Sequence, residues 1–178
     1  MSKLKGTKTE KNLWKAFAGE SMARNKYTYF AKVAKNEGYE QVADIFLETA
    51  ENEKEHSKLW FKALEELGDT KENLKHAAEG EHGEANSMYP AMAEEAHEEG
   101  FNRIAFLFEK VAEIEAKHEA RYKQLLKNIE EDKVFEREDK KVWKCRNCGY
   151  LHESERALGV CPVCQHPKAF FEIKADNY

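Results

Sequence analysis

Glutamate and histidine recur in this chain as Glu-x-x-His, a spacing that places both side chains on one face of a helix. With 29 Glu and 7 His in 178 residues, chance alone predicts about one such pair. There are four, namely Glu53/His56, Glu79/His82, Glu94/His97 and Glu115/His118. Carboxylate oxygens and imidazole nitrogens together are typical ligands of iron, manganese and zinc. Because the chain is so rich in Glu, the motif alone is weak evidence of metal binding, and helical phase must decide among the four pairs.

Helical phase selects two of these four pairs. At about 100° per residue, Glu53/His56 and Glu115/His118 interrupt faces that are otherwise apolar. The other two pairs lie about 100° or more from the apolar face of their own helix, and we expect them in solvent.

Three more glutamates lie on inward faces, one on the first predicted helix and two on the third. The inward set is Glu20, Glu53, Glu81, Glu84 and Glu115, with His56 and His118. Burying these charges without partners would be costly, and mutual repulsion would raise the carboxyl pKa values. Two metal ions resolve this, because five carboxylates lie between the charges of two Fe(II) and two Fe(III). One Glu from each of two helices plus Glu-x-x-His from the other two is the di-iron or di-manganese carboxylate pattern.

The four cysteines form a second candidate metal site. Cys145 and Cys148 make one CxxC knuckle, and Cys161 and Cys164 make another after 12 intervening residues. This spacing predicts a tetrahedral tetrathiolate site. A structural zinc ribbon fits it, whereas Gly149-Tyr150, Pro162 and the redox-capable helices favour Fe(Cys)4.

Helix-start and helix-stop signals divide the first part of the chain into four long helices. Thr7-x-x-Glu10 and Asp69-x-x-Glu72 are capping boxes, which open the first and third helices. Gly38, Gly68 and Gly100 mark the ends of the first three at about Asn36, Leu67 and Glu99, and the fourth runs from about Phe101 to Asp132. Helices of about 30 residues joined by one to three residues predict a four-helix bundle.

The amino-acid composition changes after residue 132. All four Cys and two of the three Pro lie in the last stretch, so we expect a helical domain at 1–134, a linker at 135–141 and a small β-containing domain at 142–178. The fold class is mainly α.

Charge and hydropathy exclude several functions. The formal net charge of -5 argues against a general nucleic-acid binder. The longest apolar run, Ile104 to Phe108, is too short to span a membrane. The first six residues lack the apolar segment of an export signal, which predicts a cytoplasmic protein. Because the chain has no nucleotide-binding glycine pattern, we expect no direct binding of NADH.

The combined motifs resemble rubrerythrins. The shared strings are Ala16-Phe-Ala-Gly-Glu20-Ser, Glu53-Lys-Glu-His56, Glu81-His-Gly-Glu84 followed by Met88-Tyr-Pro90, Glu115-Ala-Lys-His118, and the two CxxC knuckles. The resemblance implies a ferritin-like di-iron bundle followed by a rubredoxin-like Fe(Cys)4 domain. It also implies a peroxidase that reduces hydrogen peroxide to water, as a defence against oxidative stress, with electrons relayed through its own rubredoxin-like centre.

The resemblance further implies ligand roles. Glu53 and Glu115 would bridge the two irons, Glu20 and Glu81 would be terminal ligands, and His118 would bind the second iron.

The residues expected to take part in catalysis also come from the resemblance. The first iron would exchange Glu84 for His56 as it is oxidised or reduced. Tyr27 and Tyr89 would form hydrogen bonds at the site.

The electron donor implied is another rubredoxin or an NAD(P)H-dependent reductase. Two alternatives stay open, a ferroxidase or iron-handling protein and a metal or electron carrier with zinc in the ribbon.

The short second connection predicts how the bundle is assembled. Ferritin-like bundles need a long crossover between the second and third helices, here a return of about 40 Å, whereas two or three residues span at most about 10 Å. The bundle is therefore either a plain up-down series or, as we favour, a domain-swapped homodimer. In the swap, Glu20, Glu53 and His56 of one chain meet Glu81, Glu84, Glu115 and His118 of the other.

Overall fold

The fold, given by a computed structural model that describes residues 3–176, is mainly helical, as predicted. The first two and last two residues of the predicted domains lie outside it. The helical elements are α1 (Lys8–Asn36), α2 (Glu40–Ala63), α3 (Thr70–Gly83), the π-helical segment η1 (Glu84–Met88), α4 (Tyr89–Glu98) and α5 (Asn102–Glu130). The remainder comprises β1 (Glu136–Cys145), β2 (Leu151–Arg156), a 3-10 turn η2 (Lys168–Phe170) and β3 (Phe171–Ile173). None of the helices within the described residues has the length and apolar composition needed to cross a lipid bilayer.

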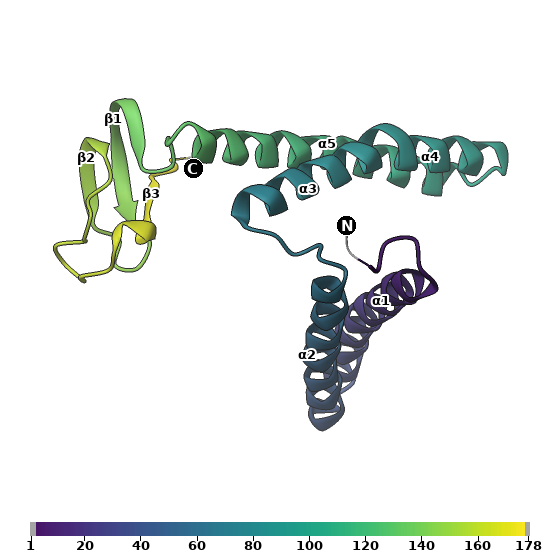
Figure 1. Cartoon of the computed structure of the whole chain (residues 1–178). Helices are drawn as coiled ribbons and strands as arrows, with labels where there is room; N and C mark the ends of the chain where they lie inside the picture. The colour runs from purple at the N-terminus through teal and green to yellow at the C-terminus, as the bar shows by residue number, and fades with distance from the viewer. Residues whose placement is uncertain (1–2, 177–178) are drawn as a thin grey trace. The chain divides into compact units, whose positions relative to one another are not determined.

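The chain forms two compact units, of which the first ends at Gly68 and contains α1 and α2. These two helices pack side by side (Figure 1). Buried Ala31, Ala34 and Ala43 lie between them, and such small side chains allow the backbones to approach closely. Gly38 ends α1 as predicted, at φ 85°, a conformation that glycine adopts without steric cost.

The second helix ends earlier than predicted. It stops at Ala63 rather than near Leu67, because Glu65 adopts a left-handed conformation at φ 62°. Glutamate seldom signals this kind of helix end, which usually falls at Gly or Asn. The connection to α3 is therefore six residues long, from Leu64 to Asp69.

The second unit begins at Asp69 and contains the remaining helices and the strands. The predicted third helix is one rod made of α3, η1 and α4, and it packs along α5 (Figure 1). The predicted capping box is present, because Asp69 and Glu72 exchange side-chain to backbone hydrogen bonds of 2.9 Å. Pro90 is the second residue of α4, where its missing N–H costs little. The π-helical segment η1 lies directly before α4, and the hydrogen-bond register of the helix changes there.

The C-terminal strands form an antiparallel sheet in the order β2-β1-β3. Its core consists of the buried side chains of Trp143, Cys145, Cys161 and Phe171. The indole N–H of Trp143 donates a 2.9 Å hydrogen bond to the backbone oxygen of Ser154. Residues 136–141 of the predicted linker are the first part of β1. The predicted domain boundaries stay a prediction.

The first testable prediction concerns His97, which joins α4 to α5. Its Nδ1 lies 3.0 Å from Oδ1 of Asn102, and its Nε2 lies 3.2 Å from a carboxylate oxygen of Glu109. The hydrogen bond to Asn102, then that to Glu109, raises the pKa of His97 above its ordinary value. Protonated His97 therefore favours the folded chain at low pH, and this contribution disappears as the pH rises through the raised pKa.

We expect a proton NMR titration to place the pKa of His97 above 6.5. Asn102→Ala should lower it, whereas Asn128→Ala, remote from His97 in sequence, serves as the control. A His97 pKa that is the same in both variants would contradict this account.

Candidate metal centres

The α1–α2 pair brings together the first group of predicted ligands. Glu20 of α1 and Glu53 and His56 of α2 offer donor atoms that all lie within 4.8 Å of one another. Nδ1 of His56 lies 2.8 Å from a carboxylate oxygen of Glu53, one helical turn away. The Glu53 side chain is 16% exposed and that of His56 52%. The group therefore lies on a solvent-accessible face of the two helices, and the Glu53 carboxylate is more buried than the His56 imidazole.

The second unit holds an equivalent group. Glu81 of α3 and Glu115 and His118 of α5 again place their donor atoms within 4.8 Å of one another. Nδ1 of His118 lies 2.6 Å from a carboxylate oxygen of Glu115 and 3.6 Å from one of Glu81. Each pair of helices therefore carries one Glu on its first helix and Glu-x-x-His on its second.

The electrostatics of the second group favour a bound cation. Burial, then the hydrogen bond and charge of Glu115 and the charge of Glu84, raise the pKa of Glu81 above its ordinary value, although His118 opposes this. The raised pKa means that the ionised form of Glu81 is disfavoured, first by burial and then by the neighbouring carboxylates. Carboxylates with imidazole are a donor set that iron accepts, so a metal ion fits these residues and would relieve the repulsion. The helices thus provide candidate di-iron ligands.

Glu84 lies beside the second group but is not part of it. It is the first residue of the π-helical segment, and it is half-buried. Its charge acts on Glu81 and on Tyr89. Burial first, then Glu84 and Glu115, raise the pKa of Tyr89, whose ring lies 6.0 Å from that of Phe108. Both residues are thus close to the ligands, and their predicted roles stay predictions.

Tyr27 lies on the face of α1 that packs against α2. Its ring stacks on that of Phe46 at 6.1 Å and is tilted against that of Phe30 at 6.3 Å. Packing against these two rings explains the position of Tyr27. The predicted hydrogen bond of Tyr27 at the metal site stays a prediction.

The two groups of ligands belong to an internal repeat that the sequence argument missed. Glu115 and His118 follow Glu53 and His56 by 62 residues. The buried alanines Ala31, Ala34 and Ala43 recur at the same offset as Ala93, Ala96 and Ala105, and Gly38 recurs as Gly100. Glu81 follows Glu20 by only 61 residues. The π-helical segment lies between Glu81 and Ala93, and one additional residue there accounts for the change of offset.

The two Glu-x-x-His pairs that helical phase rejected make other contacts. His82 pairs with Glu119 of α5 at 3.0 Å, rather than with Glu79. His97 pairs with Asn102 and Glu109. Among the described residues, neither histidine belongs to a group of three or more closely spaced metal-binding side chains.

The four cysteines form the third group. Their sulfur atoms lie within 4.8 Å of one another, with 3.6 Å between Cys145 and Cys164 and between Cys148 and Cys161. All four are free thiols. The cluster can bind one iron or zinc ion, which four thiolates hold tetrahedrally.

The backbone of each knuckle turns so that its thiols converge. Gly149 follows the first knuckle at φ 79°, and Gln165 follows the second at φ 61°. Their N–H groups donate to the backbone oxygens of Cys145 and Cys161, at 2.9 and 3.0 Å. The backbone N–H of His166 lowers the pKa of Cys164 to about 6, whereas burial and the neighbouring thiols raise that of Cys148 to about 12. Without a cation the cluster therefore favours a thiolate at Cys164 alone, and a bound metal ion would favour thiolates at the other positions as well.

Comparisons with known proteins match the whole chain. The family model named Rubrerythrin matches residues 11–126 and 72–145, and the model of the rubrerythrin rubredoxin-like domain matches residues 143–172. Rubrerythrin-1 of Clostridium acetobutylicum is 52% identical over 100% of both chains. The rubrerythrin of Porphyromonas gingivalis is 52% identical over 98% of this chain and 94% of its own. A solved structure of partially reduced nigerythrin is 34% identical, covers 94% of this chain and 87% of its own, and has a TM-score of 0.37.

The second testable prediction separates the cysteine site from the helical ligands. Cys161 is fully buried in the core of the sheet, so we expect Cys161→Ser to lose the metal ion of the cysteine cluster while the helices keep theirs. Metal analysis should show about one ion fewer per chain. Val163→Ser, in the same knuckle but 65% exposed, is the matched control and should keep the full complement. Equal metal content in both variants would show that the cluster is not a metal site.

Proposed function

The chain belongs to the rubrerythrin family, a family of oxidoreductases, and from this we propose that it reduces hydrogen peroxide to water at a dinuclear iron site. The supporting observation is that one chain carries two equivalent ligand groups and a four-cysteine cluster. Reduction of one peroxide to two waters consumes two electrons and two protons. A two-metal site and a separate one-electron centre in one chain meet this requirement.

The six grouped residues would hold the irons, with Glu84 as a further carboxylate. They are Glu20, Glu53, His56, Glu81, Glu115 and His118. A bound pair of irons supplies two electrons together, one from each metal. The cysteine cluster accepts one electron at a time from a rubredoxin or an NAD(P)H-dependent reductase, so it must act twice in each cycle.

Side chains beside the ligands supply proton control. Burial and the charges of Glu84, Glu115 and Glu81 raise the pKa of Tyr89 further above neutral pH. Its hydroxyl therefore stays protonated and can donate a hydrogen bond to an oxygen atom. Tyr89 is thus a proton-bearing group beside the residues that would hold the irons. We place this chemistry in the cytoplasm, with hydrogen peroxide as the substrate.

We also propose that the complete site forms in a domain-swapped homodimer. In a ferritin-like bundle, the chain must return along the bundle from the end of α2 to the start of α3. With α2 ending at Ala63 and α3 beginning at Thr70, the return from the level of Glu53 to that of Glu81 is about 32 Å. The six connecting residues reach about 24 Å. The difference between the required return and the reach of the connection is smaller than the sequence suggested. The connection is still too short for one chain to build a ferritin-like bundle.

Apolar side chains on the ligand-bearing helices support this association. Ile45 and Leu59 of α2 are 56% and 57% exposed, and Leu107 and Ile114 of α5 are 46% and 47% exposed. On an ideal helix these residues lie on the His56 or His118 side of their glutamate ligands. Exposed apolar patches of this kind mark interaction surfaces.

Charge then selects which units associate. Helix α1 contains seven Lys and Arg residues and two Glu, whereas the equivalent rod from α3 to α4 contains two Lys and seven Glu. Over whole units, residues 1–68 hold 12 Lys and Arg against 11 Asp and Glu, whereas residues 69–132 hold 8 against 16. Two second units would therefore repel each other strongly, and a first unit with a second unit would not. The pairing that completes the set of ligands is also the electrostatically favoured one.

The third testable prediction concerns the oxidant. We expect fully reduced protein to be oxidised at least about tenfold faster by hydrogen peroxide than by dioxygen, because the protonated Tyr89 hydroxyl beside the ligands can donate to a peroxide oxygen as the bond is cleaved. Anaerobic stopped-flow absorbance at matched oxidant concentrations measures both rates. Oxidation that is no faster with peroxide would favour the ferroxidase or iron-handling alternative.

The fourth testable prediction concerns the swap. Glu53→Ala and Glu115→Ala chains, each inactive alone, are refolded together, and heterodimers are isolated with two different affinity tags. Exchange of units gives one intact and one doubly altered site, so about half of the wild-type iron content and activity should return. Heterodimers of Glu53→Ala with Glu20→Ala, which alter the same unit, are the matched control and should recover neither. No recovery in the first heterodimer would mean that one chain builds each bundle.

A further inference from the structure

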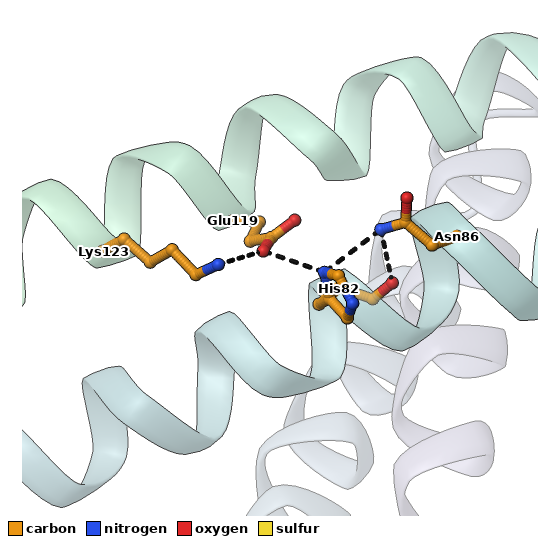
Figure 2. Close-up of polar contacts among 4 residues, drawn as sticks. All are labelled: His82, Asn86, Glu119 and Lys123. Carbon is orange, nitrogen blue, oxygen red and sulfur yellow. Dashed lines mark hydrogen bonds and ion pairs between the residues drawn. The ribbon is translucent and has the colours of Figure 1, made fainter.

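A cluster of polar side chains bridges the π-helical segment and α5 (Figure 2). Nδ1 of His82, at the end of α3, lies 3.0 Å from a carboxylate oxygen of Glu119 on α5. The side-chain amide of Asn86, inside η1, donates a 2.9 Å hydrogen bond to the backbone oxygen of His82. Lys123 pairs with the same oxygen of Glu119. The cluster thus connects the residues on either side of Glu84 to the neighbouring helix.

The direction of these hydrogen bonds follows from the groups involved. Lys123 has only hydrogens to donate, so the Glu119 oxygen that it contacts accepts. With Nδ1 of His82 donating to that same oxygen, the Asn86 amide nitrogen, 3.2 Å from this Nδ1, donates to the backbone oxygen of His82 and not to the ring. The side chain of Glu119 is 12% exposed and that of His82 is 60% exposed, so the contact is shielded from water on the Glu119 side alone.

Within residues 3–176, the other half of the internal repeat has no such cluster. The residues equivalent to Glu119 and Lys123 are Ser57 and Phe61, 62 positions earlier. Ser57 donates only to the backbone oxygen of Lys54, and Phe61 stacks on Phe17 of α1 at 5.0 Å. Helix α1 is α-helical from end to end. The bridge and the π-helical segment therefore occur in the same half of the molecule.

Glu84 is the residue that this arrangement can control. It begins η1, and its backbone oxygen accepts from the N–H of Tyr89, five residues later. A π-helical turn makes less regular hydrogen bonds than an α-helix and needs other contacts to persist. His82 and Asn86, two residues before and two after Glu84, supply such contacts.

We propose that His82, Asn86 and Glu119 are positioning residues that hold the π-helical segment against α5 and so fix the direction of the Glu84 side chain toward Glu81 and Tyr89. This inference rests on the proposed function where it gives Glu84 a part in iron binding. It adds a structural cause for the placement of a carboxylate that has no counterpart in the first unit.

The first test measures the segment itself. In metal-free full-length protein, Asn86→Ala and Glu119→Ala should each raise amide hydrogen exchange of residues 84–90 about fivefold, because each removes a contact of the π-helical turn. Glu119→Gln keeps an oxygen that accepts from His82 and should have a smaller effect. Lys54→Ala, which removes a 2.7 Å ion pair with Glu51 in the first unit, is the matched control and should leave these residues unchanged. Unchanged exchange in both alanine variants would overturn the proposal.

The second test asks whether the effect passes through Glu84. Anaerobic titration with Fe2+ should show that Asn86→Ala weakens iron binding about threefold in the wild-type background and causes no further loss in Glu84→Ala protein. An equal loss in both backgrounds would overturn the positioning role. If Glu84→Ala alone leaves iron affinity unchanged, the assignment of Glu84 to iron binding also fails, while the relative rates with peroxide and dioxygen test the proposed reaction independently.

Discussion

The cost of placing carboxylates on otherwise apolar helix faces is the constraint on which this structure depends. Each pair of helices brings two glutamates and one histidine within 4.8 Å, and the raised pKa of Glu81 reflects burial and the neighbouring acids. Such a group is stable only with a counter-charge. The same faces expose isoleucine and leucine side chains. Metal binding and the proposed association of helix pairs would therefore satisfy two requirements of one surface.

The internal repeat explains how the molecule combines symmetry with specialisation. Equivalent helices supply equivalent ligands, but only the second unit has a π-helical segment, an additional carboxylate and the bridge to Glu119. Opposite charges on α1 and on the α3–α4 rod distinguish the two halves further. In the proposed reaction, the first unit contributes ligands alone, whereas the second also positions Glu84 and keeps the proton of Tyr89.

Much of the fold was predictable because its signals are local. Capping signals at Thr7 and Asp69 marked helix starts, although Asp69 forms the reciprocal box with Glu72 whereas Glu10 accepts from the N–H of Gly6 instead of Thr7. Glycine in a left-handed conformation marked the ends of α1 and α4. The end of α2 was missed because Glu65 adopts that conformation without the usual residue type. The π-helical segment was missed because one inserted residue barely alters a periodic apolar pattern. An alignment of the two halves by their alanines would have revealed it.

The sequence by itself determined the ligand types, their helical spacing, the convergence of the four cysteines and the family, since these follow from short-range periodicity and motif spacing. Helical phase already selected the two Glu-x-x-His pairs that join a third ligand, and the tertiary structure decided which partners the other two histidines contact. It also decided that Glu119 reaches His82 across 37 residues of chain. Contacts between distant residues depend on how helices pack and where their register shifts, and a one-residue change of register rotates every following side chain by about 100°.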